Sequence, residues 1–98
     1  MKMKPISLEK IAEVTGGTYY GDESRKSDLI ANVVKDNREA SEGSLFVCLP
    51  GAKFHGHDFA DSAYENGAIC CLAEKVLDTD KPFVLVENTA KALAELAA

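Results

Sequence analysis

The stretch KDNREASEGSLFVCLPGAKFHGHDFADSAYENGA, residues 35–68, alternates polar loops with apolar segments and decides the fold. Its continuous apolar run at 45–49 is bounded by Gly43 and Pro50, which is typical of a central strand buried on both faces. The loop that follows, residues 50–57, carries two glycines, two histidines, a lysine and a phenylalanine. Binding residues collect in loops mounted on a rigid strand and helix, so we expect the functional site here.

A helix and a further strand are expected after this loop. Residues 58–66 fit a helix that Asp58 or His57 is placed to cap and Gly67 to end. The apolar run at 68–73 then indicates another buried strand. Such a strand, helix and strand are joined as parallel neighbours with a right-handed crossover. The buried side of the helix is expected to comprise Phe59, Ala60, Ala63 and Tyr64.

The remaining segments add helices and short strands around this unit. The first expected element is a helix over residues 8–14, which Ser7 caps and Gly16 and Gly17 end. Further strands are expected at 18–20, 30–35 and 83–86, and a final helix from Thr89. The order α, β, β, β, α, β, β, α indicates a single small α/β domain with a mixed β-sheet flanked by helices, in which the short early strands pair antiparallel.

The final helix bears on domain organisation. It carries Leu93 and Leu96 but reaches Ala98 without a capping glycine. We therefore expect residues 1–98 to be the first domain of a longer protein whose further domains are absent here. The alternative is a helix that frays at a natural C-terminus.

The 98-residue chain has a net charge of −5, with neither a basic stripe nor a basic helix. This balance argues against a general nucleic-acid or membrane-surface binder, although lysine and arginine can still converge on one anionic ligand. The start MKMKP is not followed by an apolar run, and no segment approaches the roughly 20 apolar residues of a membrane span. We expect a cytoplasmic protein.

The three cysteines, Cys48, Cys70 and Cys71, are odd in number and form no C-x-x-C pair. Neither a disulfide framework nor a zinc site is therefore indicated. Because they lie within apolar strand-like runs, we expect three reduced thiols that act as small hydrophobic side chains.

Catalytic motifs are absent from the sequence. There is no G-x-S-x-G elbow and no glycine-lysine phosphate loop, so this chain alone is not expected to hydrolyse ATP. His55 and His57 have ligand spacing for a metal, but Asp58 would be needed as a third donor. We therefore expect the two histidines to form hydrogen bonds with loop carbonyls or to cap the helix. The domain as a whole is expected to bind a ligand without catalysing its reaction.

Two polar segments carry the candidate binding residues. The triplet Asp36-Asn37-Arg38 is either a turn, in which Asp36 accepts backbone N–H groups and pairs with Arg38, or a place where Asn37 meets a polar ligand. The loop 51–54 offers successive backbone N–H groups, a lysine charge and an aromatic ring. Those are the parts that hold a pyrophosphate and stack a planar base.

The quoted stretch resembles the N-terminal domain of the Mur ligase family. The family pattern is an acidic-Ser/Thr-Arg triplet, a turn with glycine, L-F-V-A-L-x-G, a loop, and G/A-H-D-F followed by a helix and G-A. This chain has DNR at 36–38, EGSLFVCLPG at 42–51, HGHDFA at 55–60 and NGA at 66–68. Residues 7–21 and 86–98 also resemble the branch that adds D-alanyl-D-alanine, so the resemblance covers essentially the whole chain.

The resemblance implies a domain that binds the uridine diphosphate end of UDP-N-acetylmuramoyl-tripeptide. In the family, the intact enzyme uses ATP and Mg²⁺ to form an acyl phosphate on that peptide, which the amine of D-alanyl-D-alanine then attacks during peptidoglycan synthesis. The ATPase and C-terminal domains would follow residue 98, so this fragment alone would be inactive. It is expected to contain neither a catalytic residue nor a metal site.

The resemblance also implies which residues touch the nucleotide. The family contacts correspond here to Lys35, Asn37, Ala52, Lys53 and Phe54. Asn37 replaces the usual Ser or Thr by a larger amide that can still donate and accept. Arg38 is expected to be either the structural partner of Asp36 or a contact to the distal phosphate.

Two alternatives stand beside this interpretation. One is a free-standing nucleotide-binding or regulatory module of the same fold. The other is the sister ligase that adds the third peptide residue, although its N-terminal domain usually lacks the leading helix expected at 8–14. We expect a monomer whose partners are small molecules.

Overall fold

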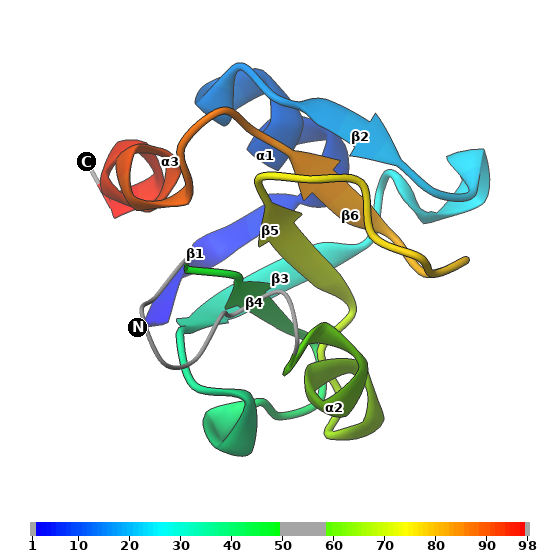
Figure 1. The fold of residues 1–98 in the computed structure, drawn as a ribbon. Coiled ribbons are helices and arrows are strands. Elements are labelled where there is room, and N and C mark those ends of the chain that lie inside the picture. Colours follow the sequence, from blue (N-terminus) through cyan, green and yellow to red (C-terminus); the bar gives the residue numbers. More distant parts are fainter. Residues whose placement is uncertain (1, 50–58, 98) are drawn as a thin grey trace.

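A computed structural model describes residues 2–49 and 59–97 of the chain (Figure 1). The described strands are β1 (Lys2–Ser7), β2 (Thr18–Tyr20), β3 (Leu29–Val34), β4 (Ser44–Val47), β5 (Cys70–Ala73) and β6 (Phe83–Leu85). The described helices are α1 (Leu8–Thr15), α2 (Ala60–Glu65) and α3 (Thr89–Ala97), with short 3₁₀ turns η1 (Glu23–Arg25) and η2 (Asn37–Glu39). The expected α/β class is confirmed.

One mixed sheet of six strands lies at the centre, in the order β1-β3-β4-β5-β6-β2. The four inner strands β3 to β6 are parallel, and the two outer strands pair antiparallel, β1 with β3 and β2 with β6. The expected parallel step through the quoted stretch is confirmed, because Leu45 of β4 pairs with Cys70 of β5. Parallel strands of this kind are buried on both faces.

Helices cover both faces of the sheet, α1 and α3 on one side and α2 on the other (Figure 1). Along β4 and the residue that follows it, Leu45 and Val47 belong to the core cluster that includes α1 and α3, whereas Phe46 and Cys48 belong to the cluster that includes α2. Alternate residues of a strand point to opposite faces, so a strand between two covered faces is apolar at every position. This explains the continuous apolar run.

The first element of the fold is the strand β1, whereas the sequence pattern predicts the helix at residue 8 as the first element. β1 pairs with β3 in an irregular register, with Lys2 opposite Asn32 and Ile6 opposite Ile30. Its side chains Met3 and Ile6 both pack against the same core cluster. Because they are three residues apart, they give no alternating signal, and pairing with β3 forms this strand where the local pattern does not predict it.

Helix α1 begins and ends where the sequence predicts, within one residue. The Ser7 hydroxyl accepts a hydrogen bond from the backbone N–H of Lys10 at 3.1 Å, which caps the first turn. Gly16 takes the left-handed conformation at the other end, with φ of 68°. Leu8 and Ile11 form the buried stripe of the helix.

Helix α2 is shorter than expected. It spans Ala60–Glu65, and Phe59 occupies the N-cap position without a side-chain capping hydrogen bond. The two residues proposed as caps, His57 and Asp58, lie outside the described residues. The expected buried side is confirmed for Ala60, Ala63 and Tyr64, while Phe59 is partly buried.

The three thiols are free and fully buried, as the sequence predicts. Burial raises the pKa of the Cys70 thiol, and a hydrogen bond with Cys71 together with burial raises the pKa of the Cys48 thiol. Cys48, directly after β4, and Cys70 in β5 therefore pack in the core as neutral thiols.

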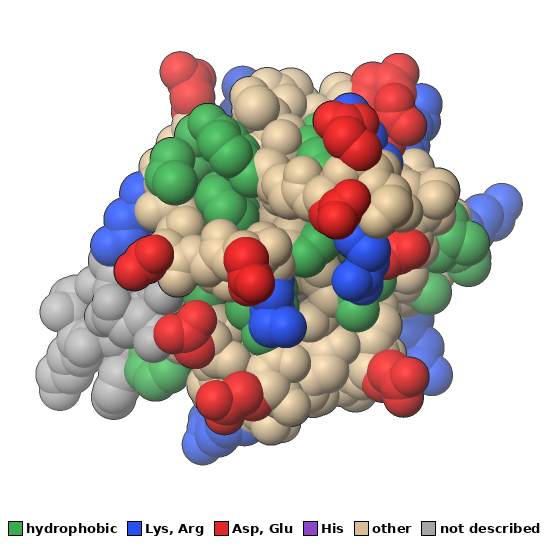
Figure 2. Space-filling model, turned by 90° about the vertical axis from the view of Figure 1, so that its right-hand side faces the viewer, with side chains coloured by type: hydrophobic (Ala, Val, Ile, Leu, Met, Phe, Trp, Pro, Cys, Tyr) green, Lys and Arg blue, Asp and Glu red, His purple; other side chains and the backbone are tan. Residues whose placement is uncertain are grey.

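The surface mixes both signs of charge. Acidic and basic side chains are interspersed over the face shown in Figure 2 and form no continuous basic patch there. Within residues 2–49 and 59–97, no helix combines the length and the apolar character needed to cross a bilayer.

Candidate functional site

One of the two candidate segments, the turn at 35–38, lies at the carboxyl edge of the parallel strands. Val34, the last residue of β3, pairs with Phe46 in β4, and these adjacent strands run in the same direction. Lys35 follows β3 directly, and Leu49 is the last described residue after β4. Ligands of open α/β sheets bind outside the carboxyl ends of their strands. The turn at 35–38 therefore lies at the edge where a binding site is expected.

Asp36 organises this turn. Its carboxylate accepts a hydrogen bond from the backbone N–H of Arg38 at 2.9 Å, and its Oδ2 lies 2.7 Å from Nη2 of the Arg38 guanidinium. The backbone N–H of Glu39 also donates to the Asp36 carbonyl, which closes the 3₁₀ turn η2. The structural interpretation of the triplet is thus confirmed for Asp36 and Arg38.

The Arg38 contacts set the acidity of Asp36. The hydrogen bonds from the Arg38 side chain and backbone lower the pKa of the Asp36 carboxyl from 3.8 to about 2. Because the folded pKa lies below the unfolded one, the ion pair is complete above about pH 4 and is lost as the pH falls through about 2. We expect a ¹³C NMR titration of the side-chain carboxyls to show Asp36 ionised well below its usual range.

The variant Arg38→Ala is expected to move the Asp36 pKa back toward 3.8. Some lowering should persist, since the backbone N–H at position 38 still donates to the carboxylate. Lys35→Ala is the matched control, because it removes a neighbouring positive charge that makes no hydrogen bond to Asp36 among the described residues. An Asp36 pKa unchanged by Arg38→Ala would contradict this assignment.

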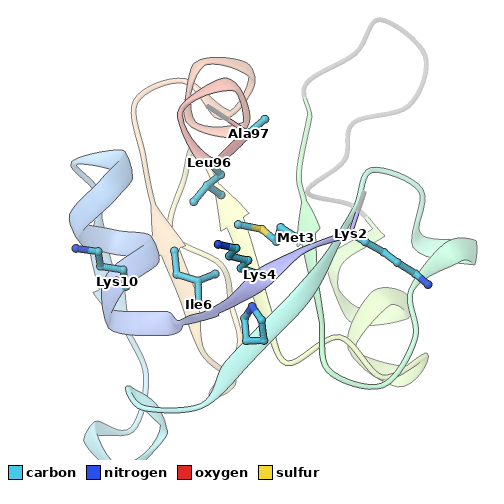
Figure 3. A pocket seen from close by; sticks show the side chains of 8 residues that line it. Lys2, Met3, Lys4, Ile6, Lys10, Leu96 and Ala97 are labelled. Atoms are coloured by element: carbon cyan, nitrogen blue, oxygen red, sulfur yellow. The ribbon is translucent and has the colours of Figure 1, made fainter.

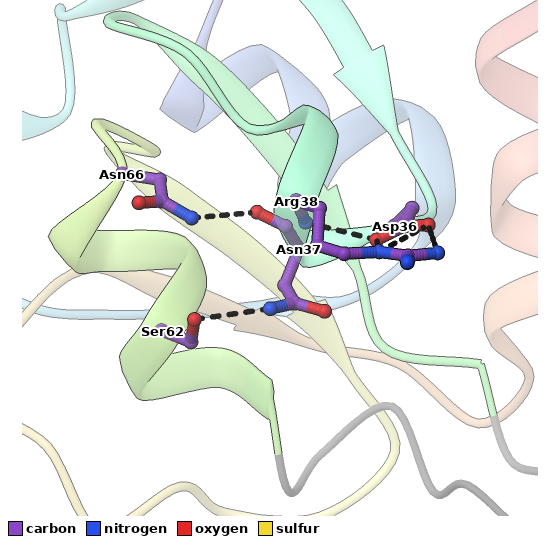
Figure 4. Close-up of polar contacts among 5 residues, drawn as sticks. All are labelled: Asp36, Asn37, Arg38, Ser62 and Asn66. Atoms are coloured by element: carbon purple, nitrogen blue, oxygen red, sulfur yellow. Dashed lines mark hydrogen bonds and ion pairs between the residues drawn. The ribbon is translucent and has the colours of Figure 1, made fainter.

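Asn37 joins the turn to helix α2 (Figure 4). Its side-chain amide donates to the Ser62 hydroxyl at 3.0 Å, and its backbone carbonyl accepts from the side-chain amide of Asn66 at 2.9 Å. Ser62 and Asn66 are four residues apart and therefore lie on the same side of the helix. We call these three residues the Asn37 clamp.

The clamp adds two residues that the sequence analysis did not identify. Ser62 and Asn66 were expected only as parts of a helix. The signal that could have found them is their polar spacing on a helix whose other face is apolar, opposite the polar turn at 35–38. The Asn37 amide, which the resemblance assigns to a ligand, is thus also part of the structure that positions α2.

A double-mutant cycle measures the strength of the clamp. We expect Asn37→Ala and Ser62→Ala each to lower the free energy of unfolding by about 1 kcal/mol, with a coupling energy of similar size, because the bond is partly buried. Urea denaturation gives all four values. Ser24→Ala serves as a control away from the clamp, where Ser24 bonds to Asp22. Additive losses from Asn37 and Ser62 would show that the bond contributes nothing.

A second feature lies near the start of α2. A cavity of about 360 Å³ is lined by Ala60, Asp61, Lys75, Val76, Leu77, Asp78 and Thr79. It combines two carboxylates with one lysine, so its lining does not favour an anion.

The predicted contact residues divide into two groups. Lys35, Asn37 and Arg38 lie close together in the chain after β3, at the carboxyl edge, with Asn37 and Arg38 in η2. Ala52, Lys53 and Phe54 lie outside the described residues, as do the histidines and Asp58 that were weighed as metal ligands. Among the described residues, no cluster of His, Cys, Asp or Glu side chains is suited to hold a metal ion.

Comparison with known sequences identifies the family. The profile described as "Mur ligase family, catalytic domain" matches residues 29–98. The chain is 47% identical over 84 residues to the UDP-N-acetylmuramoyl-L-alanyl-D-glutamate–2,6-diaminopimelate ligase of Bacillus velezensis, covering 82% of this chain and 17% of the relative. It is 36% identical over 97 residues to the UDP-N-acetylmuramoyl-tripeptide–D-alanyl-D-alanine ligase of Escherichia coli, covering 98% of this chain and 20% of the relative.

A solved structure shows the same fold. A crystal structure of MurF from Acinetobacter baumannii matches with a TM-score of 0.85 and 25% identity, covering 98% of this chain and 21% of that one. The chain thus spans about a fifth of the length of the relatives that it matches. The sequence profile and the fold agree, and this chain belongs to the Mur ligase family.

Proposed function

We propose that this chain is the N-terminal domain of an ATP-dependent peptidoglycan ligase, and that it holds the uridine diphosphate end of UDP-N-acetylmuramoyl-tripeptide. The observation that carries the proposal is the place of the turn at 35–38. It stands at the carboxyl edge of the sheet, beside β4, the strand after which the sequence predicts the glycine-bearing loop 50–57. That edge is where open α/β sheets bind nucleotides.

The electrostatics of the turn fit a diphosphate. The protein carries a net charge of −5, so it needs locally placed donors to hold a dianion. The Arg38 guanidinium is fixed by Asp36 while its side chain remains 83% exposed. Lys35, three residues earlier in the chain, adds an exposed cation. Lys53 is proposed as a third cation, from the loop outside the described residues.

ATP and Mg²⁺ would be bound elsewhere in a longer protein. The sequence contains no glycine-lysine phosphate loop, and the described residues contain no cluster of carboxylates suited to a metal ion. This chain would therefore anchor substrate, and the residues that activate and join the peptide would lie in further domains. A G-T-x-G-K-T/S motif encoded within about 20 residues after Ala98 would support this and exclude the free-standing module.

Two ligase activities compete for this assignment. The D-alanyl-D-alanine-adding activity is favoured by the match to MurF across 98% of the chain, which includes β1 and α1. The activity that adds 2,6-diaminopimelate is favoured by the higher identity, 47%, to the Bacillus velezensis relative. A 2,6-diaminopimelate ligase of Listeria innocua also matches 99% of the chain at 36% identity, so the sequence match over the leading strand and helix does not separate the two activities. We assign the first activity because the solved structure that shares the fold over 98% of the chain is a MurF.

Assays of the complete natural protein decide between the two. With UDP-N-acetylmuramoyl-tripeptide, ATP and D-alanyl-D-alanine, we expect phosphate release and a product lengthened by the dipeptide. With UDP-N-acetylmuramoyl-L-alanyl-D-glutamate and 2,6-diaminopimelate, we expect neither. The reverse result would assign the second activity. If the protein bound the UDP substrate but showed neither ligase activity, it would be the free-standing binding module.

Lys53 provides a test of substrate anchoring. In the complete protein, Lys53→Ala is expected to weaken binding of the UDP substrate roughly tenfold and to leave ATP binding unchanged, because one charge-assisted contact to a phosphate is lost. Lys81→Ala, a change at an exposed lysine in the connection before β6, is the matched control. Calorimetric titration measures both ligands, and an unchanged affinity for the UDP substrate would count against the assignment.

A further inference from the structure

A groove lies over β1 (Figure 3). It has a volume of about 500 Å³ and is lined by Lys2, Met3, Lys4, Pro5, Ile6, Lys10, Leu96 and Ala97. These residues come from the outermost strand β1 and from the two helices that share one face of the sheet, α1 and α3. The groove is therefore a gap in the helical layer, at the end of the sheet where β1 lies.

The floor of the groove is apolar. Met3 and Ile6 are half-buried and pack against the core cluster that contains Leu96. In Figure 3, Ile6 and Met3 on β1 and Leu96 on α3 surround one hollow. The irregular register of β1 allows this, because it lets two side chains three residues apart contact the same core.

The charges around the floor have one sign. The lining contains three lysines and no carboxylate, although the whole chain has 16 acidic and 11 basic residues. Lys2 and Lys4 are exposed and make no ion pair among the described residues. Lys10 lies 3.7 Å from Glu13 on the exposed side of α1. An acidic protein thus carries a local basic rim around an apolar floor.

We propose that this groove docks an acidic amphipathic helix of a partner polypeptide. The apolar side of such a helix would cover Met3, Ile6 and Leu96, and its carboxylates would meet the lysines at the rim. A helix placed there would extend the layer that α1 and α3 form over the sheet.

The edge of β1 argues against an added strand as the occupant. Pro5 has no backbone N–H to donate, and lysines on an outer strand oppose edge-to-edge pairing. The side chains of the groove, and not the backbone of the strand, are therefore the binding surface.

Designed peptides test the proposal on the 98-residue chain. The probe is a fluorescein-labelled 18-residue helix with Leu at i, i+3, i+4 and i+7 spacing and Glu and Ala elsewhere, and its counterpart carries Lys in place of Glu. By fluorescence anisotropy, we expect the acidic peptide to bind at least roughly tenfold more tightly than the basic one, with an affinity that falls as salt rises. Equal binding of the two peptides, or binding of neither, would overturn the proposal.

Charge reversal locates the contact. The double variant Lys2→Glu/Lys4→Glu is expected to weaken binding of the acidic peptide roughly tenfold. Each substitution turns an attraction between a lysine and the peptide carboxylates into a repulsion. The double control Lys75→Glu/Lys81→Glu makes the same change of net charge away from the groove and should have much less effect. Circular dichroism melts confirm that each variant is folded. Equal losses in the two double variants would show a general charge effect and overturn the proposal.

Discussion

Replacing Phe46 by alanine is expected to lower the free energy of unfolding by about 4 kcal/mol, the largest effect of any change considered. Phe46 is 1% exposed, on the central strand β4, and it belongs to the core cluster beneath α2. Alanine removes the ring and leaves a cavity that a strand hydrogen-bonded on both sides cannot close. Urea denaturation measures the loss as a fall in the midpoint with an unchanged slope.

Two further variants keep this prediction decisive. Phe46→Leu, which should cost about 1.5 kcal/mol, remains measurable if Phe46→Ala does not fold. Val76→Ala is the surface control, because Val76 is 61% exposed. This variant should change the free energy of unfolding by no more than about 0.5 kcal/mol. If Phe46→Leu and Val76→Ala lowered the free energy of unfolding equally, the prediction that Phe46 stabilises the core would be wrong.

Gly67→Ala is expected to lower the free energy of unfolding by about 3 kcal/mol, the second largest effect. Gly67 has φ of 113°, which side-chain-bearing residues rarely adopt. A Cβ atom there would stand 2.6 Å from the backbone nitrogen of Glu42, so the connection before β4 would have to move. Gly67 also accepts a hydrogen bond from the backbone N–H of Gly43, which fixes the two segments together.

Gly16→Ala separates the effect of backbone strain from the effect of the steric contact. Gly16 has φ of 68°, yet an added Cβ would meet nothing within 4 Å. Its alanine variant should therefore show conformational strain alone, about 1 kcal/mol, and the excess at Gly67 measures the steric contact. Differential scanning calorimetry or urea denaturation gives both values. Equal losses at the two glycines would contradict the close approach of the segments at 67 and 42.

The candidate site shows where reasoning from sequence alone stops. The turn formed by Asp36 and Arg38 is local, and the preference of aspartate for backbone donors predicts it from three neighbouring residues. The contacts of Asn37 with Ser62 and Asn66 join positions 25 and 29 residues apart. No local pattern encodes them, because they depend on how β3, β4 and α2 are placed relative to one another.

The sequence by itself determined the central strand, the three helices, the caps of α1, the burial of the thiols and the family to which the chain belongs. These follow from hydrophobic period, from glycine and serine at helix ends, and from motifs whose residues are neighbours in the chain. Only the tertiary structure decided that residues 2–7 form a strand, that Asn37 holds α2, and that an apolar groove with a basic rim lies over β1. Each of these depends on groups distant in sequence, whose free energy of interaction exists only after the sheet has formed.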